Sequence, residues 1–157
     1  MEETVIMFSS KFVIGLLIFI IFVHIIATVN YWYWIIWWFD IPMHFLGGFW
    51  VAIVFIWLNS KFDILKFNPI NGIVRTITTF ITVLSFAAFI GVLWEFAEFL
   101  FDVFISSGGY EKIIQQDVAD TLGDLFFDLV GGLTAAIIFL IGRRKANSAE
   151  SNTTDYR

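Results

Sequence analysis

The sequence predicts an all-α integral membrane protein, built as a bundle of four transmembrane helices. Of its 157 residues, 59% are hydrophobic and only 15% are charged, and the mean hydropathy is +0.85. Soluble domains are about half apolar and about a quarter charged. The apolar residues also form runs of the roughly 20 residues that a membrane-spanning helix requires. A water-soluble globular domain is therefore excluded.

The charge and the cysteine content narrow the functional classes. The formal net charge is −5, which argues against a nucleic-acid partner. The chain has no cysteine, so disulfides, thiolate metal ligands and cysteine nucleophiles are excluded. The partner that the composition itself implies is the lipid bilayer of the cell membrane.

The first predicted span covers residues 12–29. It is followed by Tyr and Trp residues at 31–34 and 37–38, which are typical of the headgroup level of a membrane. A cleaved signal peptide is the alternative for this run. The run is long for a signal peptide, it lacks a convincing cleavage site of small residues, and further spans follow. We therefore expect a retained helix.

Three further spans are predicted at residues 41–58, 76–104 and 117–141. The second follows Asp40, a suitable N-cap, and Pro42 is tolerated in its first turn. Because this span is short, a re-entrant helix stays open as an alternative. Residues 1–145 thus form one transmembrane domain, and the polar residues 146–157 are expected to form a disordered tail.

Basic residues predict the orientation of the spans. With four spans, Lys11, the basic residues of the loop 59–75 and those after residue 142 all fall on one side. Of the nine Lys and Arg residues, only Lys112 falls on the other side. A count of three or five spans would destroy this asymmetry, so both termini are predicted to be cytoplasmic.

Acidic residues follow one face of each of the last two spans. Glu95, Glu98 and Asp102 lie within an arc of about 60°, since a helix turns about 100° per residue. The arc on the last span is about 80°, and its members are Asp117, Asp120, Asp124 and Asp128. Gly91 and Gly131 continue the two stripes, and glycines on such a face allow helices to approach closely.

The predicted orientation places these acids at one depth, near the outer surface. Asp40 and His44, at the start of the second span, and His24, in the first, also lie in outer halves. A charged residue near the bilayer centre costs about 2.5–3.5 kcal/mol on insertion scales. Only Lys112 is available on this side to neutralise the acids. The acids could therefore be protonated, line a wet cavity or bind cations.

Some of these polar residues have ordinary structural explanations. Asp40 and Asp117 suit helix N-caps, Asp102 and Glu111 could be solvated at the interface, and His24 stands alone on an apolar span. Two carboxylate stripes and an imidazole suit a divalent metal ion, with Mg, Mn, Ca, Zn and Fe not distinguished. The predicted metal ligands are His44, Glu95, Glu98, Asp120, Asp124 and Asp128.

Three motifs carry a resemblance to known membrane proteins. They are Asp40-Ile-Pro-Met-His44-Phe-Leu-Gly-Gly, Gly91-Val-Leu-Trp-Glu95-Phe-Ala-Glu98 and Asp120-Thr-Leu-Gly-Asp124-Leu-Phe-Phe-Asp128-Leu-Val-Gly131. Over residues 40–132 the chain resembles the YjdF-type membrane proteins and, more distantly, VanZ-like proteins. VanZ-like proteins typically carry Asn where this chain has Asp128 and Gln where it has Glu98, which favours the YjdF type. The resemblance implies an architecture and this set of site residues, without implying a reaction.

Three classes of function stay open. A metal-dependent enzyme could act on a lipid or an envelope-linked substrate, for example one that bears phosphate. Intramembrane acids also mark ion and proton transporters, although the inner halves of these spans are almost wholly apolar. In an accessory structural protein the acids would be buried, protonated and hydrogen-bonded.

Overall fold

The computed structural model describes residues 8–62, 72–108 and 118–154. These residues form five α-helices and no strand: α1 (Ser10–Val29), α2 (Trp32–Ile35), α3 (Asp40–Phe62), α4 (Gly72–Ser107) and α5 (Val118–Thr154). Four of them are long and apolar enough to cross a membrane, over Ser10–Val29, Asp40–Phe62, Gly72–Phe104 and Val118–Lys145. The prediction of an all-α, multi-pass membrane protein with four spans is confirmed.

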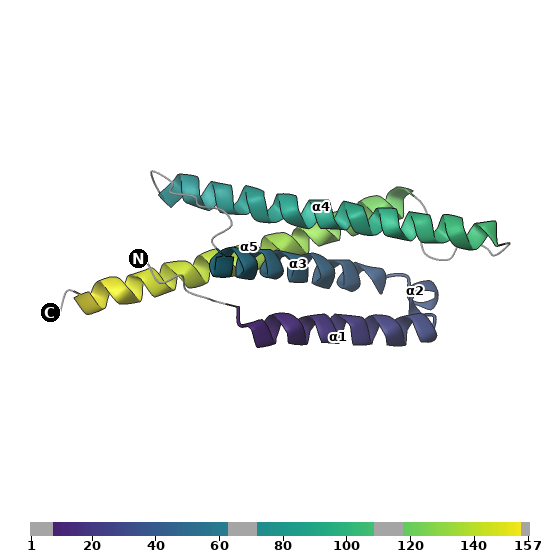
Figure 1. The fold of residues 1–157 in the computed structure, drawn as a ribbon, viewed down its shortest axis with the longest axis horizontal. Coiled ribbons are helices and arrows are strands. Elements are labelled where there is room, and N and C mark those ends of the chain that lie inside the picture. Colours follow the sequence, from purple (N-terminus) through teal and green to yellow (C-terminus); the bar gives the residue numbers. More distant parts are fainter. Residues whose placement is uncertain (1–7, 63–71, 109–117, 155–157) are drawn as a thin grey trace.

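The four long helices lie side by side and alternate in direction (Figure 1). α3 occupies a central place, because it packs on α1, α4 and α5. We call the end where α2 lies the α2 end of the bundle; α1 and α4 finish there, and α3 and α5 begin there. This alternation is what four complete crossings require.

Two helices extend further than the sequence predicts. α3 has 23 residues and ends at Phe62 rather than near residue 58. At 1.5 Å per residue it is about 34 Å long, enough to cross a hydrocarbon core of about 30 Å, so a re-entrant segment is not needed. α5 continues to Thr154, so residues 146–154 are helical where a disordered tail is expected. Ala146, Ala149 and Glu150 favour helix, and no Gly or Pro interrupts this segment.

The apolar core of the bundle lies away from the α2 end. Ile53 of α3 and Val83 of α4 are its largest fully buried apolar side chains, and Ala135 and Ala136 of α5 pack between them. The indole Nε1 of Trp50 donates a hydrogen bond of 2.9 Å to the carbonyl oxygen of Val13 and joins α3 to α1. This packing holds the helices together from below and leaves the polar residues in the other half of the bundle.

Glycines bring the backbones of α3 and α5 into contact. A Cβ atom at Gly131 would overlap the carbonyl group of Phe45 and lie 2.7 Å from the amide nitrogen of Phe49. A Cβ atom at Gly48 would overlap the backbone of Asp128. The expectation that Gly131 serves close helix packing is therefore confirmed, with α3 as the helix on which it packs.

Candidate functional site

The candidate site is centred on His44, one turn into α3. Its imidazole is 7% exposed. The Nε2 atom lies 3.5 Å from Oδ1 of Asp40, on the preceding turn, and 3.6 Å from Oδ1 of Asp124 on α5. The Nδ1 atom lies 3.6 Å from Oδ1 of Asp128, one turn further along α5. Both nitrogens of one imidazole thus face carboxylates.

α4 supplies two further carboxylates to the same imidazole. One ligand atom each from His44, Glu95 and Glu98 lies within 4.8 Å of the others, and the same holds for Asp40, His44 and Asp124. Both carboxylate oxygens of Glu95 are buried. Glu98 accepts a hydrogen bond of 2.8 Å from the indole Nε1 of Trp94, four residues earlier on the helix. His44 is therefore the residue that the two groups of potential metal ligands share.

The distances around His44 suit ligands of a common ion. An N–H···O hydrogen bond is about 2.7–3.2 Å long, shorter than the 3.5 Å and 3.6 Å that separate Nε2 from Asp40 and Asp124. At metal–ligand distances of about 2.0–2.2 Å, two ligands of one ion lie about 3–4.4 Å apart. The arrangement has the separations of a coordination sphere.

The electrostatics of the site also favour a cation. Asp124, Asp128 and Glu95 are each no more than 6% exposed, and all three converge on one histidine. Carboxylates that approach each other in a medium of low dielectric repel strongly. Protons or a bound cation relieve that repulsion, and an imidazole next to carboxylate oxygens adds a nitrogen ligand for a divalent ion.

Five of the six predicted ligands meet at His44, and the sixth does not. His44, Glu95, Glu98 and Asp124 belong to the two ligand groups, and Asp128 lies against the imidazole. Among the residues that the structure describes, Asp120 belongs to neither group; it is half-buried on α5 one turn before Asp124.

Two other acids differ from their expected places. Asp40 is expected mainly as an N-cap, yet its carboxylate lies against His44, and the i, i+4 spacing of the two residues is the signal for this contact. Asp102 is expected at a solvated interface, yet it is 1% exposed. Its position on the same stripe as Glu95 is the signal for burial. Asp117 and Glu111 lie outside the described residues.

Tyr33 is a polar neighbour of the site that the sequence analysis assigns only to the aromatic belt. Its hydroxyl lies 2.8 Å from Nδ1 of His24, and its ring packs edge-on against Phe39 at 5.2 Å. Burial and the nearby carboxylates of Asp40 and Glu98 raise the pKa of Tyr33, so its hydroxyl stays protonated at neutral pH. His24 itself is exposed, and its ring is held by this tyrosine.

Together these features define a class: a multi-pass membrane protein of four spans, whose buried carboxylates and one histidine gather in the half of the bundle nearer the α2 end. The chain belongs to the family described as "Predicted membrane protein (DUF2238)", whose model matches residues 5–145. No curated protein and no solved structure matches the chain.

Proposed function

We propose that this protein is a metal-dependent membrane enzyme, which holds a divalent cation at the His44 cluster and acts on a lipid or an envelope-linked substrate. The observation that carries the proposal is the convergence of carboxylates from α3, α4 and α5 on one buried imidazole. A purely structural bundle gains nothing from several buried carboxylates at one depth, because each of them costs free energy in hydrocarbon.

The donor set defines what the site would hold and supply. Asp40, His44 and Asp124 form one face of the site, and Glu95 and Glu98 form the other. Carboxylate oxygens with one imidazole nitrogen suit Mg, Mn, Zn or Fe. Such an ion can polarise a phosphoryl or carbonyl oxygen, or activate a water molecule. Carboxylates beyond those needed as ligands are available to accept the proton of that water.

Two further observations support the location and the family relationship. The distribution of basic residues favours the extracytoplasmic side for the α2 end of the bundle, and hence an outward-facing site. The motifs at Asp40–His44, Glu95–Glu98 and Asp120–Asp128 resemble those of the YjdF-type proteins. We infer that the YjdF-type proteins and the family matched here describe one group.

Transport is the alternative that the same acids suggest. The buried charged residues described in the structure (His44, Glu95, Asp102, Asp124 and Asp128) all lie toward the α2 end, whereas the buried residues of the other half are apolar. A path for ions across the membrane needs polar groups or water along its full length. This distribution favours a site entered from one side over a pathway through a single chain.

Elemental analysis tests the proposal. Wild-type protein, purified in mild detergent, is dialysed in turn against Mg²⁺, Mn²⁺ and Zn²⁺, and is compared with Glu98→Gln, Asp124→Asn and the control Glu150→Gln, which lies beyond the last span. We expect about one bound ion per chain in the wild type and the control, and at least a tenfold loss in the two site variants. A wild type that retains none of the three ions would overturn the metal site and favour protonated acids in a proton-linked or structural protein.

A further inference from the structure

We propose that a groove between α4 and α5 receives the hydrocarbon chain of a phosphate-bearing lipid, and so brings the phosphate of that lipid to the His44 cluster. The inference rests on the proposed function, since it names the class of substrate for the same site. It is carried by a cavity that opens toward the bilayer on one side and adjoins the cluster on the other.

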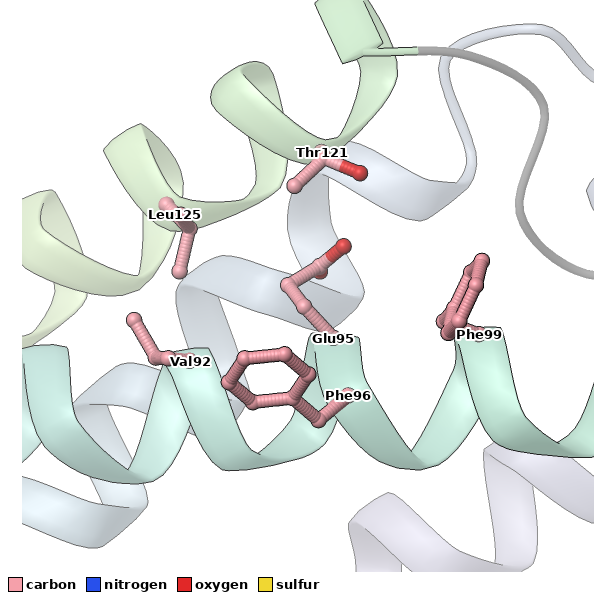
Figure 2. A pocket seen from close by; sticks show the side chains of 6 residues that line it. All are labelled: Val92, Glu95, Phe96, Phe99, Thr121 and Leu125. Atoms are coloured by element: carbon pink, nitrogen blue, oxygen red, sulfur yellow. The ribbon is translucent and has the colours of Figure 1, made fainter.

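The groove has a volume of about 350 Å³, within the range of about 300–1,000 Å³ that is common for small-molecule sites. Figure 2 shows its lining, which comes from two helices that are neighbours in the bundle. α4 supplies Val92, Glu95, Phe96 and Phe99, and α5 supplies Thr121 and Leu125. Four of these six side chains are hydrocarbon, which suits an acyl or isoprenoid chain.

The mouth of the groove lies within the membrane. Val92 and Phe96 are 40% and 59% exposed, and both lie within the Gly72–Phe104 span of α4. The residues from Val92 to Phe99 cover about 10 Å of helix axis at 1.5 Å per residue, less than one leaflet of a hydrocarbon core about 30 Å thick. The medium that meets these side chains is therefore lipid, from a single leaflet.

The inner end of the groove is shared with the His44 cluster. Glu95 lines the groove and also belongs to the ligand group of His44 and Glu98. Figure 2 shows its carboxylate directed away from α4, toward Thr121 of α5. A Cβ atom at Gly91 would lie 3.2 Å from Cδ2 of Leu125 and 2.6 Å from Oδ2 of Asp128. A groove residue and a cluster residue therefore meet at the same glycine.

The chemistry of the two ends points to an amphiphile that bears phosphate. Carboxylates alone repel a phosphate group, but a Mg²⁺-type ion held by one or two carboxylates keeps coordination positions for phosphate oxygens. Free phosphate would arrive from water and would gain nothing from a hydrocarbon groove open to lipid. A lipid phosphate satisfies both ends, with its chain in the groove and its phosphate beside Glu95.

Photo-crosslinking tests the position of the chain. The full-length protein, loaded with Mn²⁺, is reconstituted in phosphatidylcholine vesicles that contain phosphatidic acid with a diazirine in its acyl chain. We expect crosslinks concentrated on residues 92–99 and 121–125, and at least a fivefold loss in Val92→Trp, which fills the groove. Leu93→Trp is the matched control, because Leu93 is 47% exposed but does not line the groove. Labelling spread evenly over the exposed apolar faces, α1 included, would overturn the proposal.

A second probe tests the role of the phosphate. Diacylglycerol with the same diazirine chain lacks that group, so we expect at least tenfold weaker groove labelling than with phosphatidic acid. We also expect chelation of Mn²⁺ to remove the difference between the two probes. Equal labelling by both probes in Mn²⁺-loaded protein would overturn the inference.

The metal content of the same samples separates the two proposals. Val92→Trp that keeps its Mn²⁺ and loses the crosslinks supports the inference, and Leu125→Trp repeats the test if Val92→Trp does not purify as a monodisperse protein. Wild type that keeps its Mn²⁺ without groove crosslinks would overturn the lipid inference alone. Wild type without any bound metal would instead overturn the proposed function.

Discussion

The backbone of Gly48 on α3 lies directly against the backbone of Asp128 on α5. A Cβ atom at position 48 would overlap the carbonyl oxygen of Asp128 and lie 2.5 Å from its Cα atom. One turn earlier on α3, Nδ1 of His44 lies 3.6 Å from the carboxylate of the same aspartate. The close crossing of the two helices is therefore what allows one imidazole to reach two carboxylates of α5.

Substitution of Gly48 by alanine is expected to destabilise the protein. The added methyl group would meet backbone atoms, which cannot move aside as the end of a flexible side chain can, so α3 and α5 must separate. We expect the free energy of unfolding to fall by about 1–3 kcal/mol or more, as measured by denaturation in mixed micelles. Separation of the helices should also weaken the binding of Mn²⁺.

Gly123→Ala is the matched control for this change. Gly123 also lies on α5, but a Cβ atom there would have nothing within 4 Å. Alanine is favoured over glycine inside a helix by about 0.5–1 kcal/mol, so this variant should be as stable as the wild type or slightly more stable. Equal effects of Gly48→Ala and Gly123→Ala would contradict the close crossing.

Substitutions at His44 and Asp120 should separate a ligand from a neighbour. His44 belongs to both ligand groups, whereas Asp120 belongs to neither among the described residues. Loss of a partner outside the ligand shell typically costs about 10–100-fold in metal affinity. We therefore expect a loss beyond about 100-fold for His44→Gln and below about tenfold for Asp120→Asn in Mn²⁺ titrations followed by electron paramagnetic resonance. Equal losses would place Asp120 among the ligands.

The predicted orientation can be tested with single cysteines, because the native chain contains none. Ser107 and Lys61 are exposed at opposite ends of the bundle, at the last residue of α4 and near the end of α3. If both termini are cytoplasmic, a membrane-impermeant maleimide should label Ser107→Cys in intact cells, and Lys61→Cys only after permeabilisation. The opposite pattern would place the His44 cluster toward the cytoplasm.

Tyr33 is expected to resist ionisation in the folded protein. Burial and the carboxylates of Asp40 and Glu98 raise its pKa above the usual 10.0, so the folded state keeps this proton longer than the unfolded state does. Stability should therefore fall as the pH rises above about 10, and Tyr33→Phe should reduce that fall. The absorbance of tyrosinate at 295 nm should be nearly the same in the two proteins up to pH 11. An excess of one full tyrosinate in the wild type below pH 10.5 would contradict the raised pKa.

The elements of this fold are predictable because they depend on local properties of the chain. A run of about 20 apolar residues is enough to identify a span, and all four predicted spans are helices in the structure. The acidic stripes follow from the helical period alone. Glu95 and Asp102 on α4 and Asp124 and Asp128 on α5 are buried, as residues on inward-facing stripes should be.

The ends of the helices and the roles of single acids are less predictable. α5 continues to Thr154 because its polar residues still favour a helix, a preference that span length does not reveal. Asp102 looks like an interfacial residue in the sequence, and only its packing within the bundle makes it the most buried carboxylate that the structure describes. Asp40 has an adequate explanation as an N-cap until a neighbouring helix places Asp124 beside the same imidazole.

The sequence by itself determined the class of the protein, the number of its spans and the residue types available for a site, because these follow from composition, run length and period. Only the tertiary structure decided that His44 is the centre, that Asp120 stands apart from both ligand groups, and that a groove beside Glu95 opens to the lipid. These relations join residues about 50 to 85 positions apart, such as His44 with Glu95 and Asp128. They depend on how each helix is rotated and how closely it packs, which side-chain volume at the crossings decides, as at Gly48 and Gly131.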